Sequence, residues 1–269
     1  MAFQWINPKE FSFNCLLLMD RYLIRMVCMV DDERYARQMG IALANHPAVA
    51  WYCQTKAPEA AERVKALIAA APAGCSREEI RAAECFVLDW NDWAVVYVYP
   101  EVMNRNCAYI YDWDKRRLLE LTDFRDKVVL DVGAGTGRLT FAAAQEARHV
   151  YASEPCDRLR EYLREKISRE GIPNVSVLDG FAASLPYEDD TFDIVMSGHV
   201  VGDDYGTELA ELERVVKDGG WVLDCIGENR GRAEPDQQML RHGYEPVYYL
   251  GKTGGDIYRY RKQIHKARR

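Results

Sequence analysis

The pattern of hydrophobic and polar residues changes near residues 121–127. Upstream of this point, apolar residues recur at helical spacing and predict helices over about 31–45 and 58–71. A third helix is expected to begin at Ser76, because Glu79 lies three residues further on and completes a capping box. The first part of the chain is therefore expected to be mainly helical.

Two stretches of this first region are less clear. The runs WAVVYVY (93–99) and CAYIYDW (107–113) are rich in β-branched and aromatic residues, which favours a β-hairpin, with a continuing helix through 93–99 as the alternative. Residues 11–30 are apolar, but charged residues interrupt them well before the ~20 residues that a bilayer span needs. We predict an amphipathic helix packed on the rest of the protein, and no membrane partner.

Beyond residue 127, short apolar runs alternate with amphipathic segments. Strands are predicted over 127–133, 149–155, 175–180, 192–201 and 221–227. Helices are predicted over 136–147, 156–171, 207–220 and 236–243, and an antiparallel hairpin over 244–263. This alternation predicts an α/β fold with a doubly wound, mostly parallel sheet and a reversed C-terminal hairpin strand. We divide the chain into a mainly helical N-terminal cap, 1–120, and an α/β domain, 121–269.

Composition narrows the function before any motif is considered. The 269 residues carry a net charge of −7, which disfavours a polyanionic partner such as nucleic acid. The eight cysteines include no C-x-x-C pair, so a metal site has no local support. Their scatter is typical of reduced thiols in a cytosolic protein. We therefore expect a cytoplasmic protein without a bound metal.

A glycine-rich turn follows the first predicted strand of the second region. Gly133, Gly135 and Gly137 are spaced G-x-G-x-G, which permits a tight turn and a close approach of backbone to a ligand. The dinucleotide fingerprint G-x-G-x-x-G requires glycine at 138, where this chain has Arg138. The spacing thus argues against a nicotinamide or flavin dinucleotide without excluding one.

Three acidic residues stand at successive strand ends. Asp131 directly precedes the glycines, Glu154 ends the second strand and Asp179 ends the third. A carboxylate at 154 suits the hydroxyls of a ribose, and one at 179 suits an exocyclic adenine amine. Asp131 suits an ammonium, either directly or through water. Together they fit a ligand with a diol, an amine-bearing base and a cationic part; solvated acids at helix starts are the alternative.

Residues 127–230 resemble the core of class I S-adenosylmethionine-dependent methyltransferases. VVLDVGAGTGRLT is similar to the first motif of that family, and DGFAASLPYEDDTFDIVMSGHVV to the segment before and along its fourth strand. VVKDGGWVLD is similar to its helix, turn and fifth strand. The resemblance implies a Rossmann-like fold with S-adenosyl-L-methionine as cofactor, in the branch that acts on small molecules.

The resemblance also implies roles for individual residues. The three glycines of the loop 133–137 would line the methionine and ribose part of the cofactor. Glu154 would bind the ribose diol, and Asp179 would meet the adenine amine. The backbone of Gly180 and the ring of Phe181 would lie against the base. The expected cofactor site is thus assembled from three neighbouring strand ends.

The loop after the fourth predicted strand holds the candidate catalytic residues. In the family this loop faces the sulfonium and the acceptor, which here applies to Ser197 and His199. His199 is the best-placed base for an acceptor hydroxyl, thiol or ammonium, with a structural histidine at the strand end as the alternative. Asp203 and Asp204 follow, where they either bind an amine, orient His199, or start the next helix.

The sequence of the same loop also limits the classes of methyl acceptor. Family members that methylate amines of nucleic-acid bases carry an N/D-P-P-Y/F motif after the fourth strand, where this chain reads SGHV. We therefore predict methyl transfer to a small-molecule acceptor, in which positioning supplies most of the acceleration. A non-catalytic, regulatory cofactor-binding protein and an NAD(P)-dependent oxidoreductase are the alternatives. The sequence leaves the acceptor, its reacting atom and the oligomeric state open.

Overall fold

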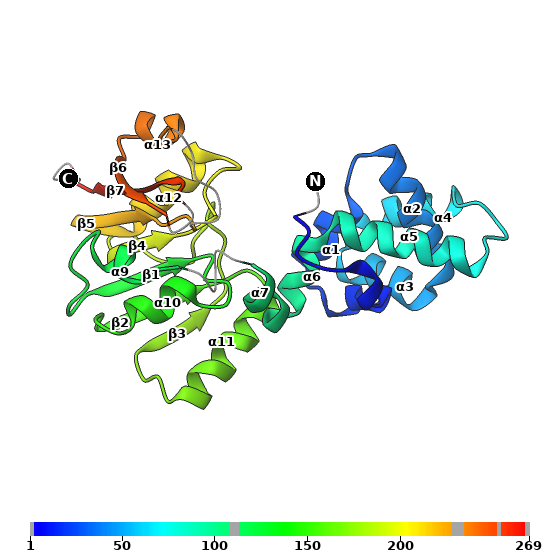
Figure 1. Cartoon of the computed structure of the whole chain (residues 1–269), viewed down its shortest axis with the longest axis horizontal. Helices are drawn as coiled ribbons and strands as arrows, with labels where there is room; N and C mark the ends of the chain where they lie inside the picture. Colours follow the sequence, from blue (N-terminus) through cyan, green and yellow to red (C-terminus); the bar gives the residue numbers. More distant parts are fainter. Residues whose placement is uncertain (1–2, 108–112, 228–233, 252–253, 267–269) are drawn as a thin grey trace. The chain divides into compact units, whose positions relative to one another are not determined.

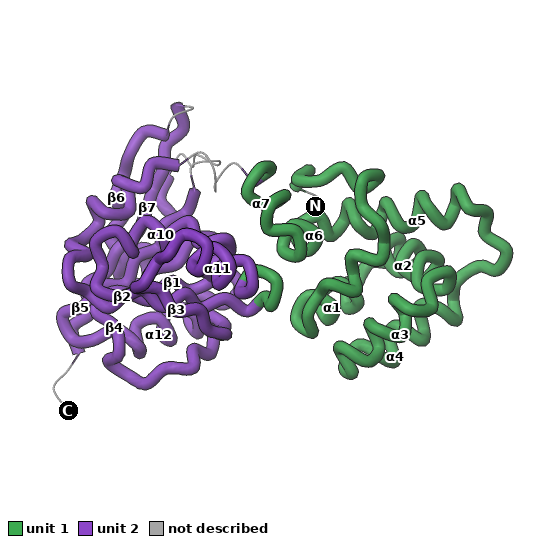
Figure 2. The backbone as a smooth tube through the Cα atoms, turned by 90° about the horizontal axis from the view of Figure 1, so that it is seen from below, with its two compact units in different colours: residues 1–106, 156–159 green, residues 107–155, 160–269 purple. Residues whose placement is uncertain are grey.

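The computed structural model describes residues 3–107, 113–227, 234–251 and 254–266. The chain divides into two compact units, coloured in Figure 2: unit 1 comprises residues 1–106 and 156–159, and unit 2 comprises 107–155 and 160–269. The second unit thus begins at residue 107, earlier than the boundary predicted at 120–121. Within the described ranges, no helix combines the length and apolar character that crossing a bilayer requires.

Unit 1 is built from helices in its described residues (Figure 1). Its α-helices are α1 (Arg21–Cys28), α2 (Glu33–Asn45), α3 (Pro47–Lys56), α4 (Ala61–Ala69), α5 (Arg77–Trp90), α6 (Asp92–Val98) and α7 (Pro100–Asn106). Its 3-10 helices are η1 (Pro8–Glu10), η2 (Phe13–Leu18) and η3 (Pro58–Ala60). Helix α2 packs against α4 and α5. The helices predicted over 31–45 and 58–71 are therefore confirmed in kind and position.

The capping box predicted at the third helix is also confirmed. The Oγ atom of Ser76 accepts a hydrogen bond from the backbone N–H of Glu79 at 3.2 Å. The side chain of Glu79 accepts one from the backbone N–H of Ser76 at 2.7 Å. Two N–H groups that the first turn of a helix leaves without a partner are thereby satisfied.

Two predictions for unit 1 are wrong. Residues 93–99 do not form a strand but belong largely to α6, in agreement with the helical alternative, and Ala94, Val95 and Val96 of this helix are all buried. Burial of the whole segment among helices overrides the β preference of its valines. The second arm predicted for this hairpin falls largely on 108–112, outside the described residues.

The segment 11–30 is likewise not one helix. It forms η2 and α1, which are separated at Asp20. The Asp20 carboxylate accepts a hydrogen bond from the backbone N–H of Leu23 at 3.0 Å, so it caps a new helix and does not continue the old one. The charge that interrupts the apolar run is therefore a helix boundary.

Unit 2 contains the predicted sheet, with seven strands among the described residues (Figure 1). They are β1 (Val128–Val132), β2 (His149–Ser153), β3 (Val175–Leu178), β4 (Phe192–Ser197), β5 (Val216–Asp224), β6 (Glu245–Leu250) and β7 (Asp256–Gln263). Their order is β3-β2-β1-β4-β5-β7-β6. Strands β1 to β5 pair in parallel, and β7 lies antiparallel between β5 and β6, as the hairpin prediction required.

Helices cover both faces of this sheet, so the doubly wound prediction is confirmed. The helices of unit 2 are α9 (Arg116–Leu119), α10 (Arg138–Ala143), α12 (Tyr205–Val215), α13 (Gln237–Arg241) and α11 (Asp157–Glu170), of which residues 160–170 belong to this unit. Val129 of β1 packs in one core with Leu139 of α10 and Leu163 of α11. Leu130, on the opposite face of the strand, packs in the other core with Leu212 of α12. Alternate residues of each central strand thus serve the two faces.

The prediction of a helix up to residue 220 is wrong at its end. Helix α12 stops at Val215 and β5 begins at Val216. The pairing of β5 with β4 shifts its register between Val216 and Trp221, where the glycine pair lies. Gly219 has φ +77° and donates its N–H to the carbonyl of Ile264 at 2.7 Å. The glycines therefore make an irregularity within a strand and do not terminate a helix.

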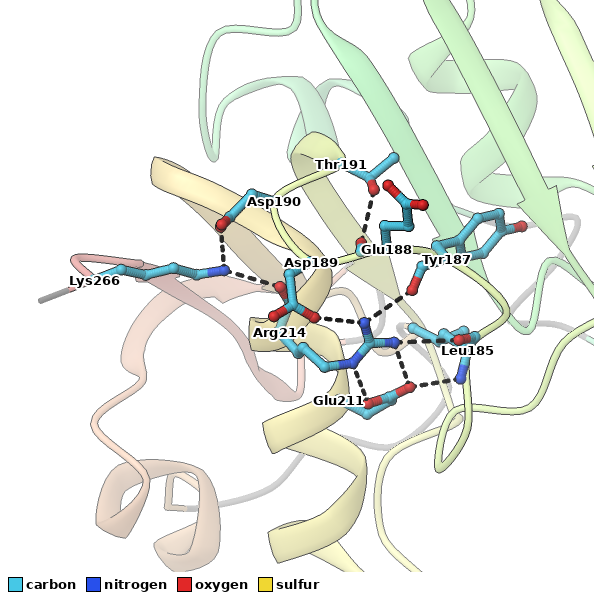
Figure 3. Close-up of polar contacts among 9 residues, drawn as sticks. All are labelled: Leu185, Tyr187, Glu188, Asp189, Asp190, Thr191, Glu211, Arg214 and Lys266. Carbon is cyan, nitrogen blue, oxygen red and sulfur yellow. Dashed lines mark hydrogen bonds and ion pairs between the residues drawn. The ribbon is translucent and has the colours of Figure 1, made fainter. Parts of the chain in front are cut away.

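One arginine organises the connection between β3 and β4 (Figure 3). Arg214 of α12 donates to the carbonyls of Leu185 (3.2 Å) and Tyr187 (2.8 Å) and to the carboxylate of Asp189 (2.9 Å). Glu211 binds the other edge of the guanidinium at 2.7 Å, and it also accepts the backbone N–H of Leu185 at 2.8 Å. Arg214 therefore fixes the loop that leads from the end of β3 into β4.

Candidate cofactor site

The glycine loop between β1 and α10 is held in one conformation by its own backbone and by its neighbours. Gly133, Gly135 and Gly137 have φ values of +67°, +57° and +90°, which residues with a side chain rarely adopt. A Cβ atom on Gly137 would lie 2.2 Å from the ring of Phe141, whereas one on Gly135 would meet no atom within 4 Å. The loop is thus closely packed on one side and open at Gly135, where a ligand can approach its backbone.

Glu154 lies next to this open position. Its side chain is only 4 % exposed, and its Oε2 atom accepts a hydrogen bond from the backbone N–H of Gly135 at 2.8 Å. The backbone of Glu154 is fixed as well, because its N–H donates to the carbonyl of Leu178 at 3.0 Å and its carbonyl accepts from Arg160 at 2.6 Å. The structure therefore brings together the two features that the sequence placed nineteen residues apart.

Asp131 lies deeper, at the end of β1. Its side chain is 1 % exposed, and it accepts a hydrogen bond from the hydroxyl of Thr140 at 2.5 Å. Burial raises the pKa of Asp131 from the ordinary 3.8 to about 7, against the opposing effect of the Thr140 hydrogen bond. Asp131 therefore titrates near neutral pH, and a cation close to it would favour its ionised form.

The end of β3 supplies the third part of the site. The carboxylate of Asp179 is 67 % exposed and pairs with Arg160 of α11 at 3.2 Å. A Cβ atom on Gly180 would lie 2.2 Å from Oγ of Ser153, so the chain passes β2 too closely for a larger residue. The ring of Phe181 is 42 % exposed. This edge thus offers an exposed aromatic ring beside an exposed acid, a suitable surface for a base that carries an amine.

Ser197 occupies a different position from the one expected. It is fully buried, and its hydroxyl donates to the carboxylate of Asp224 on β5 at 3.0 Å. The hydroxyl therefore ties β4 to β5. The part of Ser197 that remains at the site is its backbone, whose carbonyl accepts the N–H of Cys225 at 2.7 Å.

The candidate catalytic residues are spread along the loop after β4. His199 has an exposed side chain and a left-handed backbone, with φ +63°. Its Nε2 atom accepts a hydrogen bond from the backbone N–H of Gly227 at 2.7 Å. Asp204 is the N-cap of α12, where it accepts hydrogen bonds from the N–H and the hydroxyl of Thr207 at 3.2 and 2.7 Å. Asp203 is exposed.

Several contacts at this edge were not found from the sequence. Arg160 lies in the helix predicted over 156–171, and its side chain joins the ends of β2 and β3. Arg138, noted only as a departure from the dinucleotide pattern, donates to the carbonyl of Cys225 at 2.5 Å and stacks on Trp113, with its guanidinium carbon 4.8 Å from the ring centre. No local pattern signals the pairing of Arg160 with Asp179 or of Arg138 with Cys225, because these partners lie 19 and 87 residues apart in the chain.

The site fits S-adenosylmethionine on grounds of its own structure. The hydroxyl of Thr136, within the glycine loop, is buried and has no hydrogen-bond partner among the described residues, so a polar ligand group can satisfy it. The open side of Gly135 lies beside the carboxylate of Glu154. A groove of about 930 Å³ elsewhere in unit 2, near Asp123 and Trp221, contains none of these residues.

Comparisons with known proteins agree with this assignment. Residues 129–220 match a family described as "Methyltransferase domain". A demethylmenaquinone methyltransferase of Geobacillus stearothermophilus is 30 % identical over 143 residues, which cover 51 % of this chain and 57 % of that protein. The enzyme of that name from Alkalihalophilus pseudofirmus is 37 % identical over 142 residues, covering 49 % and 58 %. The chain thus spans little more than half the length of these relatives.

A solved structure shares the fold. A protein from Methanococcus maripaludis described as an S-adenosyl-L-methionine-dependent methyltransferase aligns with a TM-score of 0.51 at 16 % identity, over 63 % of this chain and 92 % of that one. At this identity the likeness concerns the fold alone. The family match, over residues 129–220, includes the glycine loop.

Proposed function

We propose that this chain, whose residues 129–220 match a family described as "Methyltransferase domain", is a class I methyltransferase, an enzyme that transfers a methyl group from S-adenosylmethionine to a small-molecule acceptor. The observation that carries the proposal is the contact of Glu154 with Gly135 beside the open side of the glycine loop. A buried carboxylate at that place suits the two hydroxyls of a ribose. The open glycine allows the rest of the cofactor to lie against backbone.

Different residues of the chain would then bind different parts of the cofactor. Glu154 would bind the ribose, while Asp179 and Phe181 would receive the adenine amine and the face of the base. Asp131, beneath the loop, would favour the ammonium of the methionine part, directly or through water. When bound, the cofactor supplies a methyl group on a sulfonium, a good leaving group, so the protein has mainly to hold donor and acceptor in line.

The acceptor is proposed to be a small molecule that enters beside the loop after β4. Two of the relatives are named demethylmenaquinone methyltransferase, which makes demethylmenaquinone the first acceptor to try. The mainly helical unit 1 is proposed to contribute to acceptor recognition. Its aromatic residues can serve either a pocket or the core of the unit.

The test is the production of S-adenosylhomocysteine from S-adenosylmethionine with a panel of small-molecule acceptors that includes demethylmenaquinone. We expect acceptor-dependent turnover that Glu154→Ala abolishes. Glu146→Ala is the matched control, because Glu146 is an exposed glutamate in the turn after α10, outside the site. Tight cofactor binding without turnover on any acceptor would instead indicate a non-catalytic protein, and preferential binding of NADH an oxidoreductase.

A further inference from the structure

The loop after β4 and the segment after β5 are joined at the carboxyl edge of the sheet. We refer to Cys225–Gly227 as the β5 exit segment. The backbone N–H of Cys225 donates to the carbonyl of Ser197 at 2.7 Å, and the N–H of Gly227 donates to Nε2 of His199, also at 2.7 Å. Arg138 donates to the carbonyl of Cys225 from the start of α10. His199 therefore provides the outermost of the bonds that hold this segment.

The bond to Gly227 fixes the protonation state of the imidazole. A backbone N–H can only donate, so Nε2 of His199 offers its lone pair and carries no proton. The ring is then neutral, and its one proton lies on Nδ1. In this geometry neither nitrogen has a lone pair left to accept a proton from an acceptor. The arrangement thus favours a holding role over the general-base role considered for this residue.

The glycine loop depends on the same arrangement. A Cβ atom on Gly133 would lie 2.3 Å from Cγ2 of Val200, so the residue next to His199 packs directly against the loop. A Cβ atom on Gly198 would lie 2.5 Å from Nη2 of Arg138 and 2.7 Å from the carbonyl oxygen of Cys225. Little space is left for the loop after β4 to move without displacing either the glycine loop or the β5 exit segment.

We infer that His199 is a positioning residue, which in its neutral form holds the β5 exit segment against the loop after β4 and thereby keeps the glycine loop in its binding conformation. The inference rests on the proposed function, because it takes the glycine loop to be the cofactor site. In this role His199 is not the base of the reaction, and the proton of the acceptor goes to another group or to water.

Two variants separate this role from the alternatives. His199→Gln keeps an acceptor oxygen at about the reach of Nε2 but cannot take up a proton near neutral pH, whereas His199→Ala keeps neither. Both retain a Cβ atom at the same positive φ, so backbone strain is matched. The measurements are the affinity for S-adenosylhomocysteine by calorimetry and the amide exchange of Gly227 by NMR without ligand.

We expect His199→Ala to weaken S-adenosylhomocysteine binding about 10-fold and to speed exchange at Gly227 to a similar degree, as for one lost hydrogen bond. His199→Gln should restore most of both. The inference is overturned if His199→Ala leaves Gly227 exchange unchanged, or if His199→Gln loses as much as His199→Ala. If the unaltered protein bound no S-adenosylhomocysteine, the proposed function would fail, while Gly227 exchange would still decide the role of His199.

Discussion

The most quantitative consequence of the structure concerns Asp131. Burial raises the pKa of this carboxyl to about 7, so about half of the unliganded molecules carry it protonated at pH 7. If the ammonium of the cofactor favours the ionised form, binding must release a proton. About one tenth of the molecules are ionised at pH 6 and about nine tenths at pH 8, so the Kd should be about 10-fold weaker at pH 6.

The matched perturbation is Asp131→Asn, which keeps an acceptor for the hydroxyl of Thr140 and removes the titration. Calorimetric titration with S-adenosylhomocysteine at pH 6 and pH 8 should show the 10-fold difference in the unaltered protein. Any titration of the ligand itself is common to both proteins, so the difference between their pH profiles isolates Asp131. Titrations in buffers of different ionisation enthalpy should also show release of about half a proton at pH 7 in the unaltered protein only.

The raised pKa of Asp131 also predicts how the free energy of unfolding changes with pH. A carboxyl whose folded pKa lies above its unfolded value binds more protons in the folded state, so it destabilises the fold as pH rises through about 4 to 7. The difference between 3.8 and about 7 corresponds to about 4 kcal/mol. Asp131→Asn should therefore gain about 4 kcal/mol of stability relative to the unaltered protein at pH 8, but only about 1 kcal/mol at pH 4.5. Identical pH profiles for both proteins, in binding and in thermal unfolding, would refute the reasoning.

Two further predictions follow from the packing of unit 2. Gly135→Ala should lower Tm less than Gly137→Ala but weaken cofactor binding, because both substitutions strain a backbone of positive φ and only the methyl at 137 also meets neighbouring atoms, those of Phe141; equal losses of Tm would contradict this. Arg214→Lys should lower the free energy of unfolding by about 2–4 kcal/mol, since an ammonium cannot replace the bidentate bond to Glu211 and the two carbonyl bonds. A loss below about 0.5 kcal/mol in thermal unfolding would contradict the role given to Arg214 in fixing the loop before β4.

The parts of the fold that the sequence predicted are those set by local pattern. The continuous apolar strands, the Ser76 capping box and the G-x-G-x-G turn each act over a few residues, so the chain itself reveals them. Glu154 could be placed beside the glycine loop because adjacent parallel strands bring their carboxyl ends to one edge. The cofactor side of the site was predictable for the same reason.

The features that escaped prediction depend on contacts between distant residues. Residues 93–99 were expected in a strand because valine prefers strands, but burial on several sides is satisfied equally well by a helix. The pairing of Arg160 with Asp179 and the bond from Gly227 to His199 join residues 19 and 28 positions apart. Such pairs form only once the sheet has brought the ends of its strands together, so no spacing in the sequence predicts them.

The central claim is that the glycine loop and Glu154 together bind S-adenosylmethionine. Its most direct test is calorimetric titration of the purified protein with S-adenosylmethionine, S-adenosylhomocysteine and NADH, repeated with Glu154→Ala and Glu146→Ala. We predict micromolar binding of the first two ligands, weakened at least about 100-fold by Glu154→Ala through the loss of two hydrogen bonds to a charged group, and unaffected by Glu146→Ala. Preferential binding of NADH, or equal affinity in the Glu154→Ala protein, would contradict the account.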